Sequence, residues 1–181
     1  MVSPFRLLRT SKNILILSLI CSLACILAFS LYVEPGLNPP SGRSHVIGLQ
    51  LAFQKSEGLK FLEAWGDTGK KHFLDTLWID FVFPAGYSLL LASLLARSIY
   101  SLHLPEWMRI IVILPFAAAL LDFIENILEF MFVSKPDSFS EYMFFMHSII
   151  ASLKWTLALF TISFLTVSSL YYRFKSSQKN P

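Results

Sequence analysis

The chain has 181 residues, of which 55% are hydrophobic, 15% aromatic and only 15% charged, and its mean hydropathy is +0.59. A soluble domain carries more charge and less phenylalanine, so the composition predicts a single membrane domain over residues 1–181. The formal net charge is only +3, and the basic residues stand mostly at the ends of apolar segments, which argues against nucleic-acid binding.

The first apolar segment, residues 14–33, is long enough to cross a bilayer. A basic start before an apolar run is also the form of a secretory signal peptide, and Ala24-Cys25 resembles a lipoprotein cleavage site. About 20 apolar residues match a full span, however, and Ser22 stands where such a cleavage site usually has Leu. We therefore expect an uncleaved first transmembrane helix.

Residues 34–72 are expected to form an extramembrane loop that contains helical structure. Residues 34–45 are rich in turn-forming residues, and residues 46–54 are apolar but too short to span a bilayer. Ser56 can cap a short helix that Gly66 can end. This helix could pack over the mouth of the bundle or lie in the membrane interface, and the packed arrangement is favoured.

Three further spans are predicted at about 73–98, 107–133 and 142–170. Pro84 in the second span is expected to kink it by removing a backbone hydrogen bond. Ser138 and Glu141 have the spacing of a capping box and are expected to open the fourth span. The predicted fold class is all-α: a polytopic membrane protein built as a four-transmembrane-helix bundle, with a helical extramembrane loop between its first two helices.

The third span carries a row of polar residues. These side chains recur at i, i+3, i+4 and i+7 and so share one helical face: Asp122, Glu125, Asn126 and Glu129. Carboxyl groups at membrane depth are unfavourable and normally face a protein interior or a water-filled cavity. The other helices should therefore cover this face, and Lys154 in the fourth span is the candidate counter-ion.

Helix geometry predicts that polar residues of neighbouring spans lie at matching depths. At a rise of about 1.5 Å per residue, Asp122 and Lys154 both fall near the bilayer midplane. Glu129 and His147 fall together nearer the outer ends of their helices. We expect the Lys154 ammonium within direct or single-water hydrogen-bond reach of at least one of three acids: Asp80, Asp122 and Glu125.

Eight residues are predicted to form this polar core: Asp80, Tyr87, Asp122, Glu125, Asn126, Glu129, His147 and Lys154. One hypothesis is a site for a small molecule or lipid headgroup, where crowded carboxyls exchange protons or bind a polar group. The alternative is a structural or interaction protein whose buried charges only hold the bundle together. A third is an ion or proton pathway, which would require an oligomer because four helices are few for a transporter.

The sequence shows no catalytic or cofactor motif that we recognise. It has no nucleophile motif, phosphate loop, dinucleotide fingerprint or metal-binding histidine pair. Glu129 and His147 could share a metal ion with Asp122 or Glu125, but the E-x-x-H motif of carboxylate-rich helix bundles is missing. We therefore predict no metal and no cofactor, and whether the protein is an enzyme stays open.

Lysine and arginine residues near the predicted spans indicate the orientation. The N-terminal segment, the 97–109 connection and the C-terminal segment are short and basic, whereas the basic residues of 34–72 lie mostly away from the helix ends, among acids. Both termini are therefore predicted to be cytoplasmic. The expected partners are membrane lipids and a small-molecule or lipid ligand, and a second copy of the chain could also bind.

Four short motifs occur between residues 46 and 160: Trp65-Gly66, Asp80 followed by Pro84-x-Gly86-Tyr87, Leu121-Asp-x-x-Glu-Asn126, and Lys154-Trp155. Together they resemble the motifs of small four-helix bacterial integral membrane proteins of unknown function. This resemblance implies a multi-pass protein of the bacterial inner membrane and no particular activity. A looser likeness to four-helix sterol-isomerase-type membrane proteins does not extend to their motifs.

Overall fold

The computed structural model describes residues 3–37 and 45–177, and its regular elements in that part of the chain are all helical. The α-helices are α1 (Pro4–Thr10), α2 (Lys12–Ala28), α3 (His45–Gln50), α4 (Lys55–Ser101), α5 (Leu114–Ser134) and α6 (Glu141–Ser177). Short π or 3-10 segments adjoin them: η1 (Phe29–Val33), η2 (Glu34–Gly36), η3 (Glu106–Ile113) and η4 (Pro136–Ser138).

Within the described residues, four helical stretches are long and apolar enough to cross a membrane: Lys12–Gly36, Lys55–Ser101, Glu106–Ser134 and Glu141–Tyr172. The prediction of an all-α chain with four such helices is therefore confirmed. The first stretch continues α2 through η1 and η2, and the third joins η3 to α5.

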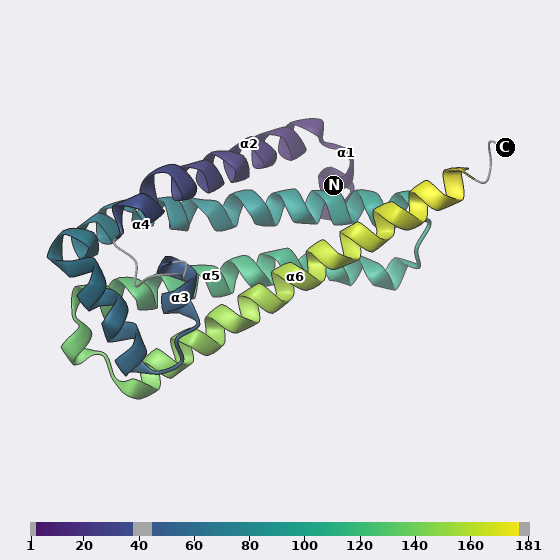
Figure 1. The fold of residues 1–181 in the computed structure, drawn as a ribbon. Helices are drawn as coiled ribbons and strands as arrows, with labels where there is room; N and C mark the ends of the chain where they lie inside the picture. The colour runs from purple at the N-terminus through teal and green to yellow at the C-terminus, as the bar shows by residue number, and fades with distance from the viewer. Residues whose placement is uncertain (1–2, 38–44, 178–181) are drawn as a thin grey trace.

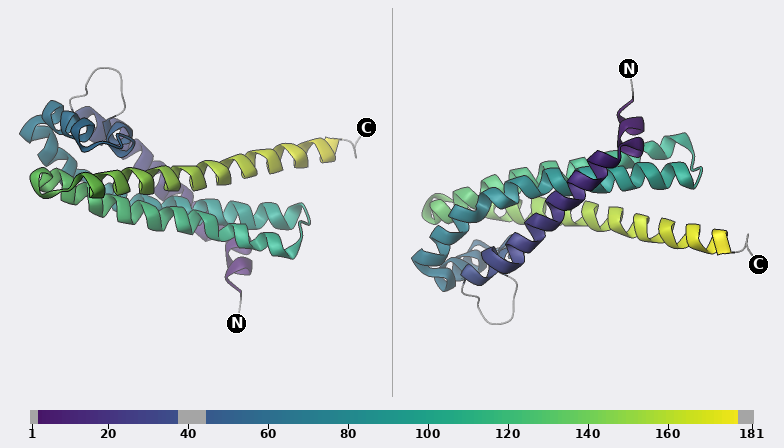
Figure 2. Two further views of the ribbon diagram at one scale, coloured as in Figure 1. Left: turned by 90° about the horizontal axis from the view of Figure 1, so that it is seen from below. Right: turned by 90° about the horizontal axis from the view of Figure 1, so that it is seen from above.

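Helices α4 and α5 form the centre of the molecule (Figure 1). Helix α4 packs against α2 on one side and α5 on the other, and α5 packs against α6. Helices α2 and α4 approach closely at Gly86, where a Cβ atom would lie 3.0 Å from Cys21 Sγ. Toward its C-terminal end α6 diverges from the other helices (Figure 2).

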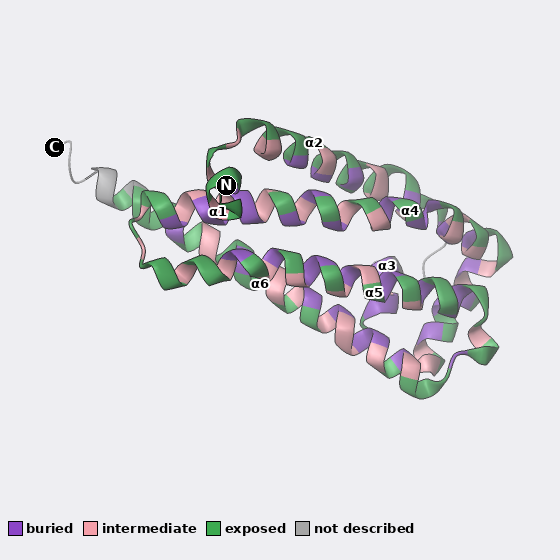
Figure 3. Cartoon of the chain, turned by 180° about the vertical axis from the view of Figure 1, so that it is seen from behind, coloured by how far each residue is buried: buried purple, intermediate pink, exposed green. Residues whose placement is uncertain are grey.

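The outer faces of α2 and α6 remain exposed, whereas α4 and α5 are more deeply buried (Figure 3). Large apolar side chains cover these exposed faces, among them Leu17, Leu27, Phe160 and Val167. Exposed apolar surface on this scale is unfavourable in water but is matched by lipid tails. The surface of the bundle therefore suits a hydrocarbon environment.

Helix α4 begins well before the predicted span at 73–98. It starts at Lys55 after Gln54, whose side chain forms no cap, so the predicted capping by Ser56 is wrong. Gly66 has φ +60° and ψ −172°, which interrupts the helix, but helical geometry resumes directly after it. A left-handed φ is readily adopted by glycine. Residues 55–65, here named the roof segment, consequently turn back across the end of the bundle (Figure 1).

The roof segment is held down by an apolar cluster. Phe61 and Trp65 of this segment are buried together with Phe132 of α5 and Phe144 of α6. The ring centroids of Phe132 and Phe144 are 4.8 Å apart, in an edge-to-face arrangement that aromatic pairs favour. The predicted packing of this helical segment over the mouth of the bundle is thus confirmed.

The start of α6 differs from the predicted capping box. Ser140 caps the helix, since its Oγ accepts a hydrogen bond from the Met143 backbone N–H at 3.1 Å. Ser138 of η4 instead donates to the Lys135 carbonyl, just before η4, at 3.0 Å. The Glu141 carboxylate accepts from the Lys55 backbone N–H at 3.3 Å, so α6 satisfies a donor at the start of the roof segment.

Candidate functional site

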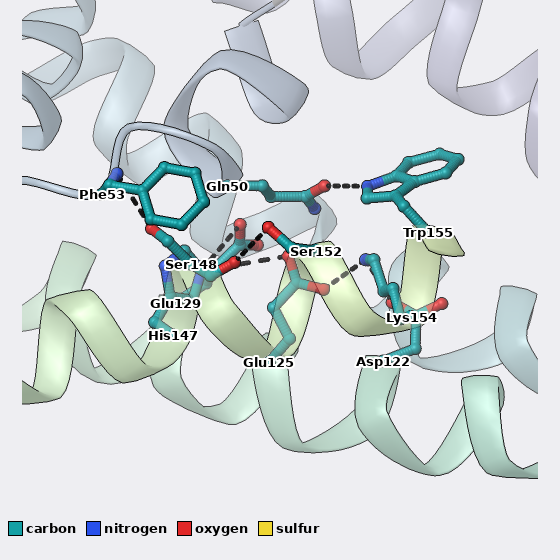
Figure 4. A network of polar contacts seen from close by, with 10 residues as sticks. All are labelled: Gln50, Phe53, Asp122, Glu125, Glu129, His147, Ser148, Ser152, Lys154 and Trp155. Atoms are coloured by element: carbon teal, nitrogen blue, oxygen red, sulfur yellow. Dashed lines mark hydrogen bonds and ion pairs between the residues drawn. The ribbon is translucent and has the colours of Figure 1, made fainter. Parts of the chain in front are cut away.

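The first part of the polar core is a buried ion-pair cluster between α5 and α6 (Figure 4). Lys154 Nζ lies 2.7 Å from Asp122 Oδ1 and also forms an ion pair with Glu125 Oε2. All three side chains are buried. The helical repeat places both acids on one face of α5, and antiparallel packing of α6 brings Lys154 to the same level. The predicted contact between Lys154 and an acid is confirmed.

The second part lies one turn further along α5. His147 Nε2 of α6 is 3.5 Å from Glu129 Oε1 and 3.9 Å from Glu125 Oε1. Glu125 therefore joins the two parts, because one of its oxygens faces Lys154 and the other faces His147 (Figure 4). The predicted proximity of Glu129 and His147 is confirmed.

Negative charge exceeds positive charge in this core. In the described part of the chain, the buried acids are Asp80, Asp122, Glu125 and Glu129, and the buried bases are Lys154 and His147. A buried carboxylate without a counter-charge is strongly unfavourable. One lysine and one histidine cannot neutralise four carboxylates, so protons on the carboxyls or a bound cation must supply the rest.

Asn126 has a function that the sequence did not reveal. Its Nδ2 donates a hydrogen bond of 2.9 Å to the backbone carbonyl of Asp80 in α4. In a regular helix that carbonyl would accept from the N–H of residue 84, but Pro84 has none. Helix α4 keeps helical φ/ψ values at Pro84, and its one non-helical residue is Gly66, so the helix continues through the proline, and the predicted kink stays a prediction. The available sequence signal was Asn126, an amide side chain on the neighbouring helix near the membrane depth of Pro84.

A cavity of about 410 Å³ lies beside the ion-pair cluster, bounded by α2, α3, α4 and α6. Four of the predicted polar residues line it and are here called its floor: Asp80, Tyr87, Asp122 and Lys154. Ser22, Glu34 and Gln50 are further polar residues of the lining. Its walls are mostly apolar and include Ile26, Phe29, Ile47, Phe83, Leu91, Ala158 and Ile162. The structure thus brings four of the eight predicted residues to a cavity, whereas the other four lie behind it: Glu125, Asn126, Glu129 and His147.

Helix α3 and the residues that follow it close one end of the cavity. Trp155 Nε1 donates to Gln50 Oε1 at 3.2 Å, and the Phe53 N–H donates to Ser148 Oγ at 3.1 Å (Figure 4). Gln50 and Ser148 are buried polar residues that sequence reasoning missed. Gln50 lies 105 positions from its partner, and periodicity within one helix carries no information about such a pairing.

Comparison with protein-family models, curated proteins and solved structures finds no match for this chain. The resemblance to small four-helix bacterial membrane proteins therefore stays a prediction, and function is argued from geometry.

The cavity combines two kinds of recognition. Its floor offers an ammonium donor in Lys154, carboxylate acceptors in Asp80 and Asp122, and a Tyr87 hydroxyl that can do either. Its walls offer apolar surface to a hydrocarbon group. A molecule with a polar head and an apolar body would satisfy both.

Proposed function

We propose that this chain is an integral membrane protein that binds an amphipathic small molecule or lipid. The supporting observation is the cavity of about 410 Å³, whose apolar walls lead to the buried Lys154–Asp122 pair. Ligand pockets typically measure about 300–1,000 Å³ and combine apolar lining with a few convergent polar groups. In this proposal the polar head lies against the floor and the apolar body lies between α2 and α6.

The floor favours a head that is neutral overall and carries hydroxyl, carbonyl or amide groups. Lys154 already contacts two carboxylates, so a strongly anionic head would compete with Asp122 and Glu125 for one ammonium. A cationic head would compete with Lys154 for the same acids. A hydroxyl or amide can both donate to a carboxylate and accept from Lys154 or Tyr87 without adding charge.

Filling the cavity should abolish retention of this ligand. Ala158 lines the cavity, whereas its neighbour Leu159 is 57% exposed on the outside of α6. Ala158→Trp should reduce the lipid that copurifies with the detergent-solubilised protein at least several-fold, as measured by mass spectrometry of organic extracts. Leu159→Trp is the matched control and should leave retention unchanged.

The polar floor makes a separate contribution. Tyr87→Phe removes one hydroxyl and should weaken binding of the copurified lipid by roughly 3- to 10-fold, the range for one hydrogen bond. The proposal is wrong if Ala158→Trp retains lipid as well as Leu159→Trp does. If the wild type itself retains none, the structural alternative is favoured, in which the Lys154 pairs serve only to join α5 to α6.

The proposal also places the protein in the bacterial inner membrane, with all four long helices across the bilayer and both termini cytoplasmic. The part of α6 near its C-terminus and the α4–η3 turn lie toward one end of the bundle, and α3 lies toward the other (Figure 1). A reporter active only outside the cytoplasm should therefore be silent at the C-terminus and active near Gly42, which lies outside the described residues. The reverse pattern would invert the orientation.

A further inference from the structure

We infer that Glu125, Glu129 and His147 form a binding site for one divalent first-row transition-metal ion, for which Zn²⁺ is the suitable probe. One ligand atom from each residue lies within 4.8 Å of the others, and all three side chains are buried. The inference does not depend on a ligand in the cavity, because none of the three residues is among those that line it.

The distances fit ligands around a common ion better than they fit hydrogen bonds. His147 Nε2 lies 3.5 Å from Glu129 Oε1 and 3.9 Å from Glu125 Oε1, beyond the usual range of about 2.7–3.2 Å for N–H···O bonds. Two ligands that each lie about 2.0–2.2 Å from one Zn²⁺ in tetrahedral geometry are roughly 3.4 Å apart. All three ligand atoms lie within 4.8 Å of one another, so binding of an ion would draw the side chains closer together.

Most of the candidate ligand atoms make no well-formed hydrogen bond within the described part of the chain, although the Gln50 side chain lies close to the Glu129 carboxylate. Within residues 3–37 and 45–177, Glu125 Oε1, both carboxylate oxygens of Glu129 and both ring nitrogens of His147 lack a hydrogen-bond partner although they are buried. Buried polar groups are normally satisfied, so a cluster of unsatisfied atoms that face one another indicates a missing binding partner. The other oxygen of Glu125 is engaged by Lys154, which leaves Oε1 free to face the histidine.

The charge and the donor atoms indicate which ion fits. A divalent cation would offset two of the negative charges that Lys154 leaves unbalanced. Ca²⁺ takes about 6–8 oxygen ligands and Mg²⁺ requires octahedral oxygen coordination, whereas this cluster offers two carboxylates and an imidazole. Such a mixed set suits Zn²⁺ and related transition ions, and three protein ligands leave a coordination position open.

The predicted absence of a metal rested on the missing E-x-x-H motif. The structure instead supplies the histidine from a different helix: Glu125 and Glu129 stand at i, i+4 on α5, and His147 faces them from α6. Two ligands at i, i+4 share a helical face, as the two histidines of H-E-x-x-H do. The spacing within α5 was therefore a usable signal, and only the third ligand required the fold.

The test is the metal content of the intact protein. Wild-type chain produced with added Zn²⁺, purified in detergent and desalted should contain close to one equivalent by inductively coupled plasma mass spectrometry. Glu129→Gln and His147→Gln, which preserve side-chain bulk, should each lower the bound zinc at least tenfold. Glu63→Gln, at an exposed position of the roof segment, is the matched control and should keep the full equivalent.

A second readout does not require any variant to fold. Production with Co²⁺ should give the wild type visible d–d absorption bands of low-symmetry coordination with nitrogen and oxygen ligands, and chelator treatment during refolding should remove them. Zn²⁺ added during refolding should also raise the thermal midpoint of the wild type. The inference is overturned if the wild type contains less than a tenth of an equivalent, or if either Glu129→Gln or His147→Gln retains the metal. In that case, protons bound to the carboxyl groups would neutralise the cluster instead of a metal ion.

Discussion

Lys154→Met is expected to destabilise the folded protein by about 3–5 kcal/mol, the usual effect of removing one side of a buried ion pair. Methionine fills the space of the lysine stem but leaves Asp122 and Glu125 without their counter-charge. Lys154 Nζ is the basic group that contacts both acids. The loss should appear as a lower free energy of unfolding in detergent micelles. It should shrink as the pH falls, because protonated carboxyls need no counter-ion.

Neutralising the partners should restore stability to this variant. Asp122→Asn added to Lys154→Met should recover part of the loss, and adding Glu125→Gln to this double variant in metal-free protein should recover more, since both acids contact the ammonium. Lys60→Met is the control, because Lys60 pairs with Glu57 at 2.7 Å on the surface, where such pairs contribute about 0–1 kcal/mol. If Lys154→Met is as mild as Lys60→Met, the buried pairs do not stabilise the bundle.

The sequence was sufficient to predict the ion-pair cluster because two strong constraints act on it. Charged groups are rare in apolar helices, so four polar residues at helical spacing define one buried face without knowledge of the fold. Because each helical residue rises by about the same distance, residues an equal number of positions from the short α5–α6 turn lie at the same depth. Lys154 was therefore expected level with Asp122, and His147 level with Glu129. Both pairings occur in the structure.

The features that could not be predicted depend on contacts between distant segments. Gly66 was recognised as a helix end, but whether a new helix resumes directly after it depends on the packing of Trp65 and Phe73. Ser138 and Ser140 both satisfy the local requirements of a cap, and in the structure Ser140 caps α6 while Glu141 accepts a hydrogen bond from the start of the roof segment. The cavity arises from the placement of α2, α3 and α6, which no single segment encodes.

Phe144→Ala should destabilise the protein by about 3–5 kcal/mol, the range for truncating a buried aromatic side chain. Phe144 is fully buried, and its ring supports the roof segment directly: a Cβ built on Gly58 would lie 2.4 Å from Phe144 Cζ. The same ring centroid is 5.6 Å from that of His147. Truncation therefore removes the apolar layer between the roof segment and the Glu129–His147 group.

Phe144→Ala should loosen the roof segment as well as lower the overall stability. With the ring removed, water can reach Glu129 and His147, and amide hydrogen exchange of residues 55–65 should accelerate more than that of the central part of α5. Phe145→Ala is the matched control, since Phe145 is the adjacent residue of α6 but is 46% exposed. It should lower the free energy of unfolding by no more than about 1 kcal/mol, the central value for point substitutions, and leave exchange in the roof segment nearly unchanged. If Phe144→Ala changed exchange in the roof segment no more than Phe145→Ala does, the roof segment would be anchored mainly by the hydrogen bonds of Phe53 and Lys55 to α6.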